Sequence, residues 1–370
     1  MTKLAWRNIT QQRLRFFISA GGVALAVLLI LVMSGVFAGS EEHAVLYIRN
    51  QPAALWAMQE GVFNLHMSSS MLSPGTVEQI RRFPNVAEAV GVLYASAGVE
   101  IGDTVIYSYV FGVDADAPFG GPWSMAQGNA NPDLSEIVID RDLAQRYGLS
   151  IGDSVSILGF PLTITGLSSG TFGIATNVVF VSKTAMALLM DVSPQAASYV
   201  LIQPQAGANV DQLAVDLMTT VTDANVLTKA EFVASDQEMI RQMGADILRM
   251  MNVIAYIIGL LVIGITVYTA MLERVREFGV LKAIGANMFQ LMSTVFVQSF
   301  VTAVTGFIAG VGLAYVVSIA VTWISPEILI VIEPDQWLSH IPMLVLVTVG
   351  ASLLPIQRIR HVDPLVVFKA

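Results

Sequence analysis

The sequence predicts an α-helical membrane protein with four transmembrane helices and a large external α/β domain inserted between helices 1 and 2. The chain is 55% hydrophobic and only 13% charged, whereas charged residues make up about 25% of an ordinary soluble protein. Its mean hydropathy is +0.67. Long apolar segments lie near both ends of the chain, and residues 40–249 between the first two are polar enough to fold in water.

Four segments have the length and the lack of charge that a membrane-spanning helix requires. They are residues 16–39, 250–272, 291–323 and 341–357. As a helix, the first would rise about 36 Å, which is enough for a hydrocarbon core of about 30 Å. A signal peptide is the alternative for this segment, but its apolar stretch exceeds the roughly 7 to 15 residues of the apolar region of a signal peptide.

The distribution of charge decides between four spans and five, because the charge-free run 283–326 is long enough for two. Residues 1–15, 273–290 and 356–370 hold ten basic residues and three acidic ones. The loop 324–340 holds three acidic residues and no basic one. The positive-inside rule then predicts four spans, with both termini cytoplasmic.

Three cytoplasmic segments and one external loop complete the predicted topology. Residues 1–15 are expected to form an interfacial helix with Trp6 at headgroup level, or else a simple basic anchor. Residues 273–290 form a cytoplasmic loop that contains a short charged helix, and residues 358–370 a cytoplasmic tail.

The external segment is acidic and has no cysteine. Residues 40–249 carry nine basic and 22 acidic residues, a net charge of −13. Nucleic acid is therefore not expected as a partner, since it would select a basic face. The absence of cysteine excludes disulfides, thiolate catalysis and thiolate metal sites.

Alternating apolar residues and turn signals predict a mixed α/β fold for the external segment. A stretch rich in Gly, Pro and Asn, residues 118–132, is interpreted as a loop that divides two subdomains. Short strands with Gly turns beyond it suggest a small barrel-like element. Strands are predicted at 64–68, 86–93, 104–113, 136–140, 154–158, 162–167 and 199–203, and helices at 74–81, 140–147, 183–190 and 210–220.

A stripe of apolar residues spaced alternately three and four apart begins at Ile240. Its first members, Ile240, Met243, Ile247 and Met250, are predicted to form a stalk and dimer seam of the coiled-coil type. Because the stripe continues into the second span, one rigid helix is expected to join the external domain to the cytoplasmic loop. The alternative is an amphipathic helix packed on its own domain.

The sequence motifs of an ATPase and of a zinc hydrolase are absent. The sequence has no Gly-Lys pair, and therefore no phosphate-binding loop. It has no HExxH zinc motif, and its four histidines are far apart. The chain is therefore predicted to be a non-enzymatic membrane subunit that binds no cofactor directly.

Two further patterns each leave two interpretations. Met33, Glu238 and Met239 could supply soft ligands for an apolar metalloporphyrin cargo, although methionine more often fills a core. The GxxxG pairs Gly35/Gly39 and Gly306/Gly310 allow close helix packing, either within the chain or between two copies.

The loop after the second span carries the most informative motif, E-R-x-R-E-F-G-x-L-K-A-I-G-A at residues 273–286. With the basic start L-x-W-R-N at 4–8, the external G-L-x-I-G-D-x-V at 148–155 and the tail Asp-Pro-Leu at 363–365, it resembles the FtsX/MacB-type permeases of ABC transporters. These are also called type VII or mechanotransmission permeases. Residues 51–61 look most like the DevC/HrtB branch.

The resemblance implies a permease of the cell membrane that pairs with a second copy or a paralogue. Its charged loop would be a coupling helix docked on a separate ABC ATP-binding subunit, which binds the ATP and Mg²⁺. Polar docking is assigned to Arg274, Arg276 and Glu277, and the buried contact to Phe278, Leu281 and Ile284, which surround Lys282.

The expected activity is export of a hydrophobic or amphipathic cargo such as heme, a lipid or a drug-like molecule. The spans lack the ionisable residues that would mark an ion path. Membrane lipids and a membrane-fusion or external adaptor protein are the other expected partners. The alternative is an FtsX-like signalling subunit that activates an external cell-wall hydrolase without moving cargo.

Overall fold

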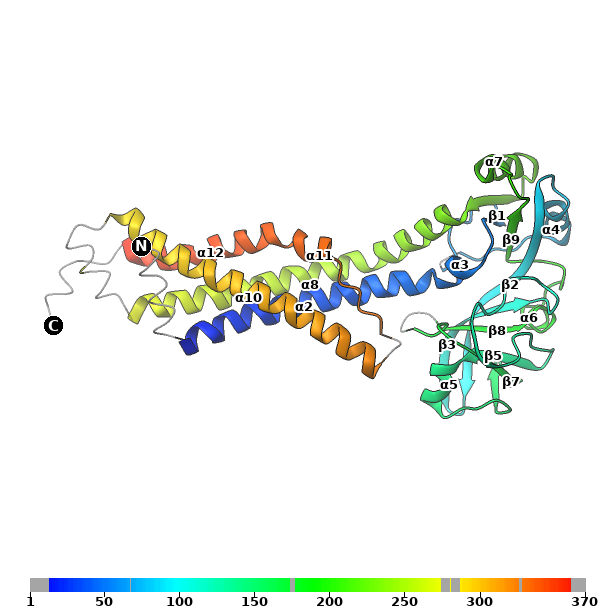
Figure 1. Cartoon of the computed structure of the whole chain (residues 1–370), viewed down its shortest axis with the longest axis horizontal. Helices are drawn as coiled ribbons and strands as arrows, with labels where there is room; N and C mark the ends of the chain where they lie inside the picture. Colours follow the sequence, from blue (N-terminus) through cyan, green and yellow to red (C-terminus); the bar gives the residue numbers. More distant parts are fainter. Residues whose placement is uncertain are drawn as a thin grey trace. The chain divides into compact units, whose positions relative to one another are not determined.

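The computed structural model describes residues 13–66, 68–173, 177–273, 280, 287–325 and 328–360. The chain divides into two compact units. The helical unit comprises Met1–Ala38, Gly244–Ile324 and Ile330–Ala370, and the α/β unit comprises Gly39–Met243 and Ser325–Leu329. Two long helices, α2 (Arg13–Ala44) and α8 (Lys229–Glu273), contribute residues to both units (Figure 1).

The α/β unit is organised around one long strand, β2, which takes part in two sheets. Its first half pairs with β9 and its second half with β3, so that it joins the antiparallel sheet β10-β1-β9-β2 to a second group of strands. The strands are β1 (Leu55–Gln59), β2 (Val86–Ile101), β3 (Thr104–Val113), β4 (Met125–Gly128), β5 (Glu136–Asp140), β6 (Ser154–Ile157), β7 (Phe160–Ser168), β8 (Val178–Ser182), β9 (Tyr199–Pro204) and β10 (Ala224–Thr228).

The second group of strands closes on itself as a small barrel. Pairing runs from β2 to β3, β8, β5, β7 and β6, and β6 returns to β2. One buried apolar cluster draws side chains from every strand of this ring, among them Val99, Val110, Ile139, Ile157, Ile164 and Val179. The barrel-like element predicted from the Gly turns is therefore present, with a core filled by side chains.

Short helices cover the sheet and the barrel, and polar caps set where they begin. Ser73 accepts a hydrogen bond from the backbone N of Thr76 at 3.1 Å and so starts α4. Gly148, with φ of 66°, ends α5 as glycine does in the left-handed conformation. The helices are α3 (Leu46–Asn50), α4 (Pro74–Arg81), α5 (Arg141–Tyr147), α6 (Lys183–Met190) and α7 (Val210–Thr220).

The predicted elements agree with the structure where local signals are strong and fail where pairing is distant. β3, β5, α6 and α7 occupy their predicted residues. The strand predicted at 64–68 is wrong for the described residues, because the backbone N–H of Leu65 bonds to a side chain and not to a neighbouring strand. β1, β8 and β10 were not predicted, and β4 lies inside the predicted loop 118–132.

The helical unit contains parts of α2 and α8 together with α10 (Met288–Ile324), α11 (Pro334–Ser339) and α12 (Ile341–Arg360). Its buried core joins α2, α8, α10 and α12 through residues such as Leu31, Ile263, Phe307 and Val347. α10 is one helix of 37 residues without a break. A chain that crossed the membrane twice here would have to reverse direction, so one span fits this segment.

Three described helical segments are long and apolar enough to cross a membrane: Phe16–Ala44, Lys229–Ile265 and Ser299–Ile324. They correspond to the first three predicted spans. α12 is a helix over residues 341–357, as expected for the fourth, but the count of four spans stays a prediction. The predicted interfacial helix at 1–15 and the tail at 358–370 lie almost entirely outside the described residues.

Both GxxxG pairs are used within the chain. A Cβ atom on Gly306 would lie 2.7 Å from the carbonyl oxygen of Ala20, and one on Gly310 would lie 2.8 Å from that of Ala24. These glycines let α10 approach the backbone of α2. On α2, Gly35 and Gly39 face the extended segment before α11, where Val331 N donates to Gly35 O at 3.0 Å.

Substitution of Gly310 by Val is expected to disrupt the packing of α10 on α2. The added side chain would meet the α2 backbone, and overpacking of this kind costs about 1 to 3 kcal/mol. The melting temperature of the purified protein in detergent should fall. Gly312→Val is the matched control, since a Cβ at Gly312 meets nothing within 4 Å; equal losses in the two variants would contradict this assignment.

Candidate functional site

The residues proposed for ATPase docking lie outside the described residues. These are Arg274, Arg276, Glu277, Phe278, Leu281, Lys282 and Ile284. The structure does describe the helices on either side, since α8 ends at Glu273 and α10 begins at Met288. The described part of the site is therefore α8 and the contacts that hold its first turns.

The predicted seam forms an exposed apolar stripe on α8. Met243 is 60% exposed, Ile247 48% and Met250 62%, while Ile240 is half-buried. The stripe continues through Ile254, Ile257 and Leu261, each more than half exposed. These exposed fractions leave the stripe accessible, and its role as a dimer seam stays a prediction. An apolar stripe of this length is available to a partner or to lipid.

The first turns of α8 are anchored in the core of the α/β unit. Phe232 is fully buried and packs on Trp56 and Tyr199. One turn later, Asp236 is also fully buried, and its carboxylate accepts a hydrogen bond from the backbone N of Leu65 at 2.8 Å. Because 232 and 236 lie on one face of the helix, this face is fixed to the domain by both apolar and polar contacts.

The buried carboxylate of Asp236 also organises the polar groups around it. Its second oxygen lies 3.1 Å from Nδ1 of His66, whose ring stands edge-on to Tyr109. Burial, reinforced by the negative charge of Asp236, raises the pKa of Tyr109 and of Tyr199 above the ordinary value. These phenols therefore stay protonated at neutral pH and can serve as hydrogen-bond donors.

A second anchor holds the start of α8 to the segment after α3. Lys229 Nζ donates to the backbone oxygen of Gln51 at 2.6 Å, and Lys229 N donates to Ala54 O at 2.9 Å. The buried side chain of Gln51 in turn accepts from Gly120 N at 2.8 Å and donates to Gly121 O at 3.0 Å. One glutamine thus connects the first residue of α8 to the loop that follows β3.

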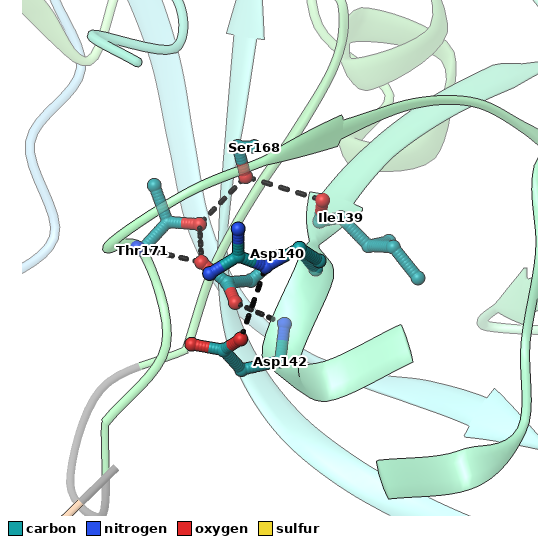
Figure 2. A network of polar contacts seen from close by, with 6 residues as sticks. Ile139, Asp140, Asp142, Ser168 and Thr171 are labelled. Atoms are coloured by element: carbon teal, nitrogen blue, oxygen red, sulfur yellow. Dashed lines mark hydrogen bonds and ion pairs between the residues drawn. The ribbon is translucent and has the colours of Figure 1, made fainter. Parts of the chain in front are cut away.

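The polar network in Figure 2 positions a loop of the barrel. Asp140 is fully buried; one carboxylate oxygen caps α5 through Asp142 N, and the other accepts from N and Oγ1 of Thr171, both at 2.8 Å. Ser168 bonds to Thr171 and to Ile139 O. Two residues further, a Cβ on Gly173 would lie 2.1 Å from Nδ1 of His43, so the loop passes close to the side chain of His43 on α2.

The residues considered for cargo binding belong to two different units, and their joint role stays a prediction. Met33 belongs to the helical unit, and Glu238 and Met239 belong to the α/β unit. Glu238 is already engaged by Arg241 at 3.3 Å and by Gln242 at 3.0 Å. Within the described ranges there is no group of three His, Cys, Asp or Glu side chains that could hold a metal ion.

Sequence reasoning missed Gln51, Lys229 and Asp236. For Asp236 a signal did exist, because an acid four residues after Phe232 on an otherwise apolar helical face needs a buried partner. Gln51 and Lys229 gave no such signal, since their partners lie in distant segments of the chain.

Two family models together match most of the chain. One, described as the MacB-like periplasmic core domain, matches residues 16–219, which is more than half of the chain. The other, described as the FtsX-like permease C-terminal, matches residues 249–364. The chain belongs to the MacB/FtsX family of ABC transporter permeases. This permease is thus a membrane subunit of the kind predicted, while its placement in the DevC/HrtB branch stays a prediction.

Curated relatives align along nearly the whole permease. The uncharacterized ABC transporter permease Rv2563 of Mycobacterium tuberculosis is 20% identical over 366 residues, which cover 98% of each chain. The pyoverdine export ATP-binding/permease protein PvdT of Pseudomonas fluorescens is 24% identical over 338 residues, which cover 85% of the permease and 51% of PvdT. The periplasmic region of MacB from Actinobacillus actinomycetemcomitans, at 12% identity, covers 50% of the permease and 92% of that chain with a TM-score of 0.38.

Replacement of Asp236 by Ala is expected to loosen the start of α8. The buried N–H of Leu65 would lose its acceptor, which costs about 1 to 3 kcal/mol. The melting temperature should fall, and amide hydrogen exchange should accelerate in residues 62–66. Asp236→Asn keeps an acceptor oxygen and should do less harm.

The matched control for this prediction is Asp246→Ala on the same helix. The Asp246 side chain is 84% exposed, and substitutions at such surface positions usually change stability by less than about 0.5 kcal/mol. Equal effects of Asp236→Ala and Asp246→Ala would show that the buried carboxylate does not anchor α8.

Proposed function

We propose that the permease transmits ATP-driven motion of a separate ATP-binding subunit through α8 to its external domain, and so exports a hydrophobic or amphipathic cargo. The observation that carries this proposal is the continuity of α8, a single helix of 45 residues from Lys229 to Glu273. It starts at the anchors on Gln51 and Leu65 and ends at the predicted coupling loop. A helix transmits displacement along its axis because its backbone hydrogen bonds resist extension.

A separate ATP-binding partner is supported by the sequence and by one relative. This chain has no phosphate-binding loop. PvdT is named an ATP-binding/permease protein, and the chain described here aligns with only 51% of its length. We infer that ATP and Mg²⁺ are bound by the separate ATP-binding subunit that this permease family implies.

The membrane orientation follows from charge. Basic residues concentrate at the N-terminus, in the loop 273–290 and in the C-terminal tail. We therefore place these segments and both termini in the cytoplasm. The membrane is the plasma membrane or inner membrane of the cell. The acidic domain 40–249 then lies outside. An external or membrane-fusion adaptor would meet it there.

The cargo class follows from the chemistry of the spans. The predicted spans 16–39, 250–272, 291–323 and 341–357 contain no Asp, Glu, Lys or Arg that could line a polar path. PvdT is named for pyoverdine export, and by analogy we assign export to this permease. Heme, a lipid or a drug-like molecule would each fit an apolar route. If heme is the cargo, we propose that Met33, Glu238 and Met239 supply its ligands.

Charge reversal at Arg276, or truncation of Phe278 to Ala, is expected to uncouple the ATP-binding subunit. Arg276→Glu removes a guanidinium expected to pair with the partner, and Phe278→Ala removes the buried contact, which should reduce co-purification at least tenfold. Co-purification, ATPase activity and transport in vesicles are measured together. Arg276→Lys should keep part of the activity, and Arg249→Glu, an exposed change on α8, should keep nearly all of it.

Unchanged co-purification, ATPase activity and transport in Arg276→Glu would contradict the coupling role. Retained coupling with no cargo movement, together with activation of an external cell-wall hydrolase, would instead establish the FtsX-like signalling function.

The exposed stripe of α8 is expected to meet the same stripe of a second copy. Because the chain contains no cysteine, single cysteines can report this contact. Ile247→Cys and Met250→Cys should form disulfide-linked dimers in membranes upon mild oxidation. Arg249→Cys is the control, because Arg249 lies on a different face although its side chain is 75% exposed. Equal cross-linking of all three variants would indicate random collision, and no cross-linking at 247 and 250 would exclude the seam.

A further inference from the structure

A pocket of about 160 Å³ lies in the α/β unit, where two parallel strands end. β3 and β8 are paired up to Val113 and Ser182, the last residues of the two strands. Residues between Asp114 and Pro122, together with residues 130–132, complete the wall. An apolar cavity of about 150 Å³ can hold a benzene ring, so this pocket has room for a molecule that contains one ring.

Rigid apolar groups form much of the pocket wall. Phe119 and Phe180 are buried side chains that line it, and Pro118, Pro122 and Pro132 line it as well. Proline has a fixed φ, so a wall that contains three prolines has fewer conformations available than an ordinary loop. Ligand sites are usually preformed and lined mainly by apolar side chains, with a few polar groups that fix the ligand.

Buried side chains hold the loop that carries this wall. The phenol oxygen of Tyr47 donates to Gly120 O at 2.7 Å. Gln51 accepts from Gly120 N at 2.8 Å and donates to Gly121 O at 3.0 Å, and Gly121 lines the pocket. Because Lys229 also bonds to Gln51, one glutamine supports both the pocket wall and the start of α8.

One carboxylate in the wall keeps bonding capacity for a ligand. Asp114 lines the pocket, its side chain is 48% exposed, and its Oδ2 lies 3.6 Å from Nζ of the buried Lys183. Within the described part of the chain, no group bonds to the other oxygen. A carboxylate can accept about four hydrogen bonds, so pairing with Lys183 leaves Asp114 able to accept more.

The charge around the pocket selects a cation. Asp116 stands between two lining residues, Ala115 and Ala117, and Asp133 directly follows a third, Pro132. Both acids are exposed. The sequence has no Lys or Arg from residue 83 to residue 140, so these acids have no basic neighbour in the segments that build the wall. A carboxylate binds a planar amidinium or guanidinium through two parallel hydrogen bonds.

We propose that this pocket binds a small organic cation, in which an amidinium, guanidinium or ammonium group is attached to an apolar body about the size of one ring. The cationic group pairs with Asp114, and the apolar body lies against Phe119 and Phe180. The site lies wholly within the α/β unit. Binding there goes beyond the proposed export function and does not depend on it.

The test compares three probes of similar shape on the full-length permease in lipid nanodiscs. Benzamidinium is the cation, benzamide the neutral probe and benzoate the anion. Saturation-transfer NMR detects the bound probe, and a titration gives its dissociation constant, with empty nanodiscs as the control for partition into lipid. Benzamidinium should bind saturably and about tenfold more tightly than the other two, because a charge-assisted hydrogen bond is stronger than a neutral one. Equal affinities for the three probes, or no saturable binding of benzamidinium, would overturn the proposal.

Asp114→Asn removes the charge and keeps the size of the side chain. Affinity for benzamidinium should fall about tenfold, while affinity for benzamide should stay the same. Because this change also leaves the buried Lys183 without its carboxylate, the double variant Asp114→Asn with Lys183→Met provides a second test and should show the same loss. Asp103→Asn, an exposed acid in the turn between β2 and β3, is the matched control and should bind like the wild type. Unchanged affinity in a folded Asp114 variant would refute the site.

Ala130→Leu fills the pocket from its wall. Affinity for benzamidinium and for benzamide should fall together, each about tenfold, because the leucine takes space and leaves the charge unchanged. Ala126→Leu, at an exposed position on β4 outside the pocket wall, is the control for size and should bind both probes normally. Unchanged affinity for benzamidinium in Ala130→Leu would contradict binding in this pocket.

Amide hydrogen exchange locates the bound probe independently. Benzamidinium should slow exchange in residues 113–122, and benzamide at the same concentration should do so less. Protection confined to the helical unit would place the probe elsewhere and would overturn the proposal.

Discussion

The structure depends on the attachment of α8 to the α/β unit through one helical face. Phe232 contributes apolar packing and Asp236 contributes a buried carboxylate that needs its partner at Leu65. Loss of that partner would leave an uncompensated polar group in the core, which makes the connection specific as well as stable. A long helix can transmit movement only if its ends do not slide, and these contacts hold one end.

Different interactions produce close packing in the two units. In the α/β unit, β2 is long enough to serve a sheet and a barrel, so the two cores share one rigid element. In the helical unit no hydrophobic effect drives helices together within a bilayer, and close approach depends on small residues instead. Gly306 and Gly310 therefore bring α10 onto the backbone of α2.

Local signals explain which elements were predictable. The cap at Ser73 and the left-handed Gly148 act within a few residues of the chain, and the apolar runs of the spans reflect hydrocarbon thickness alone. β1 and β10 pair across more than 160 residues, and no local pattern specifies such a partner. The wrong strand prediction at 64–68 has the same origin. The local pattern predicts a strand, but the backbone N–H of Leu65 bonds to Asp236, 171 residues away.

The sequence by itself determined the membrane class, the inserted external domain, the family and the exposed stripe on α8, because hydrophobic length, charge and periodicity act along the chain. The tertiary structure alone decided that the GxxxG pairs act within the chain, that β2 joins a sheet to a barrel, and that Gln51 and Asp236 hold α8. These outcomes depend on which distant surfaces fit, and complementarity of shape and hydrogen bonding exists only once the chain has folded.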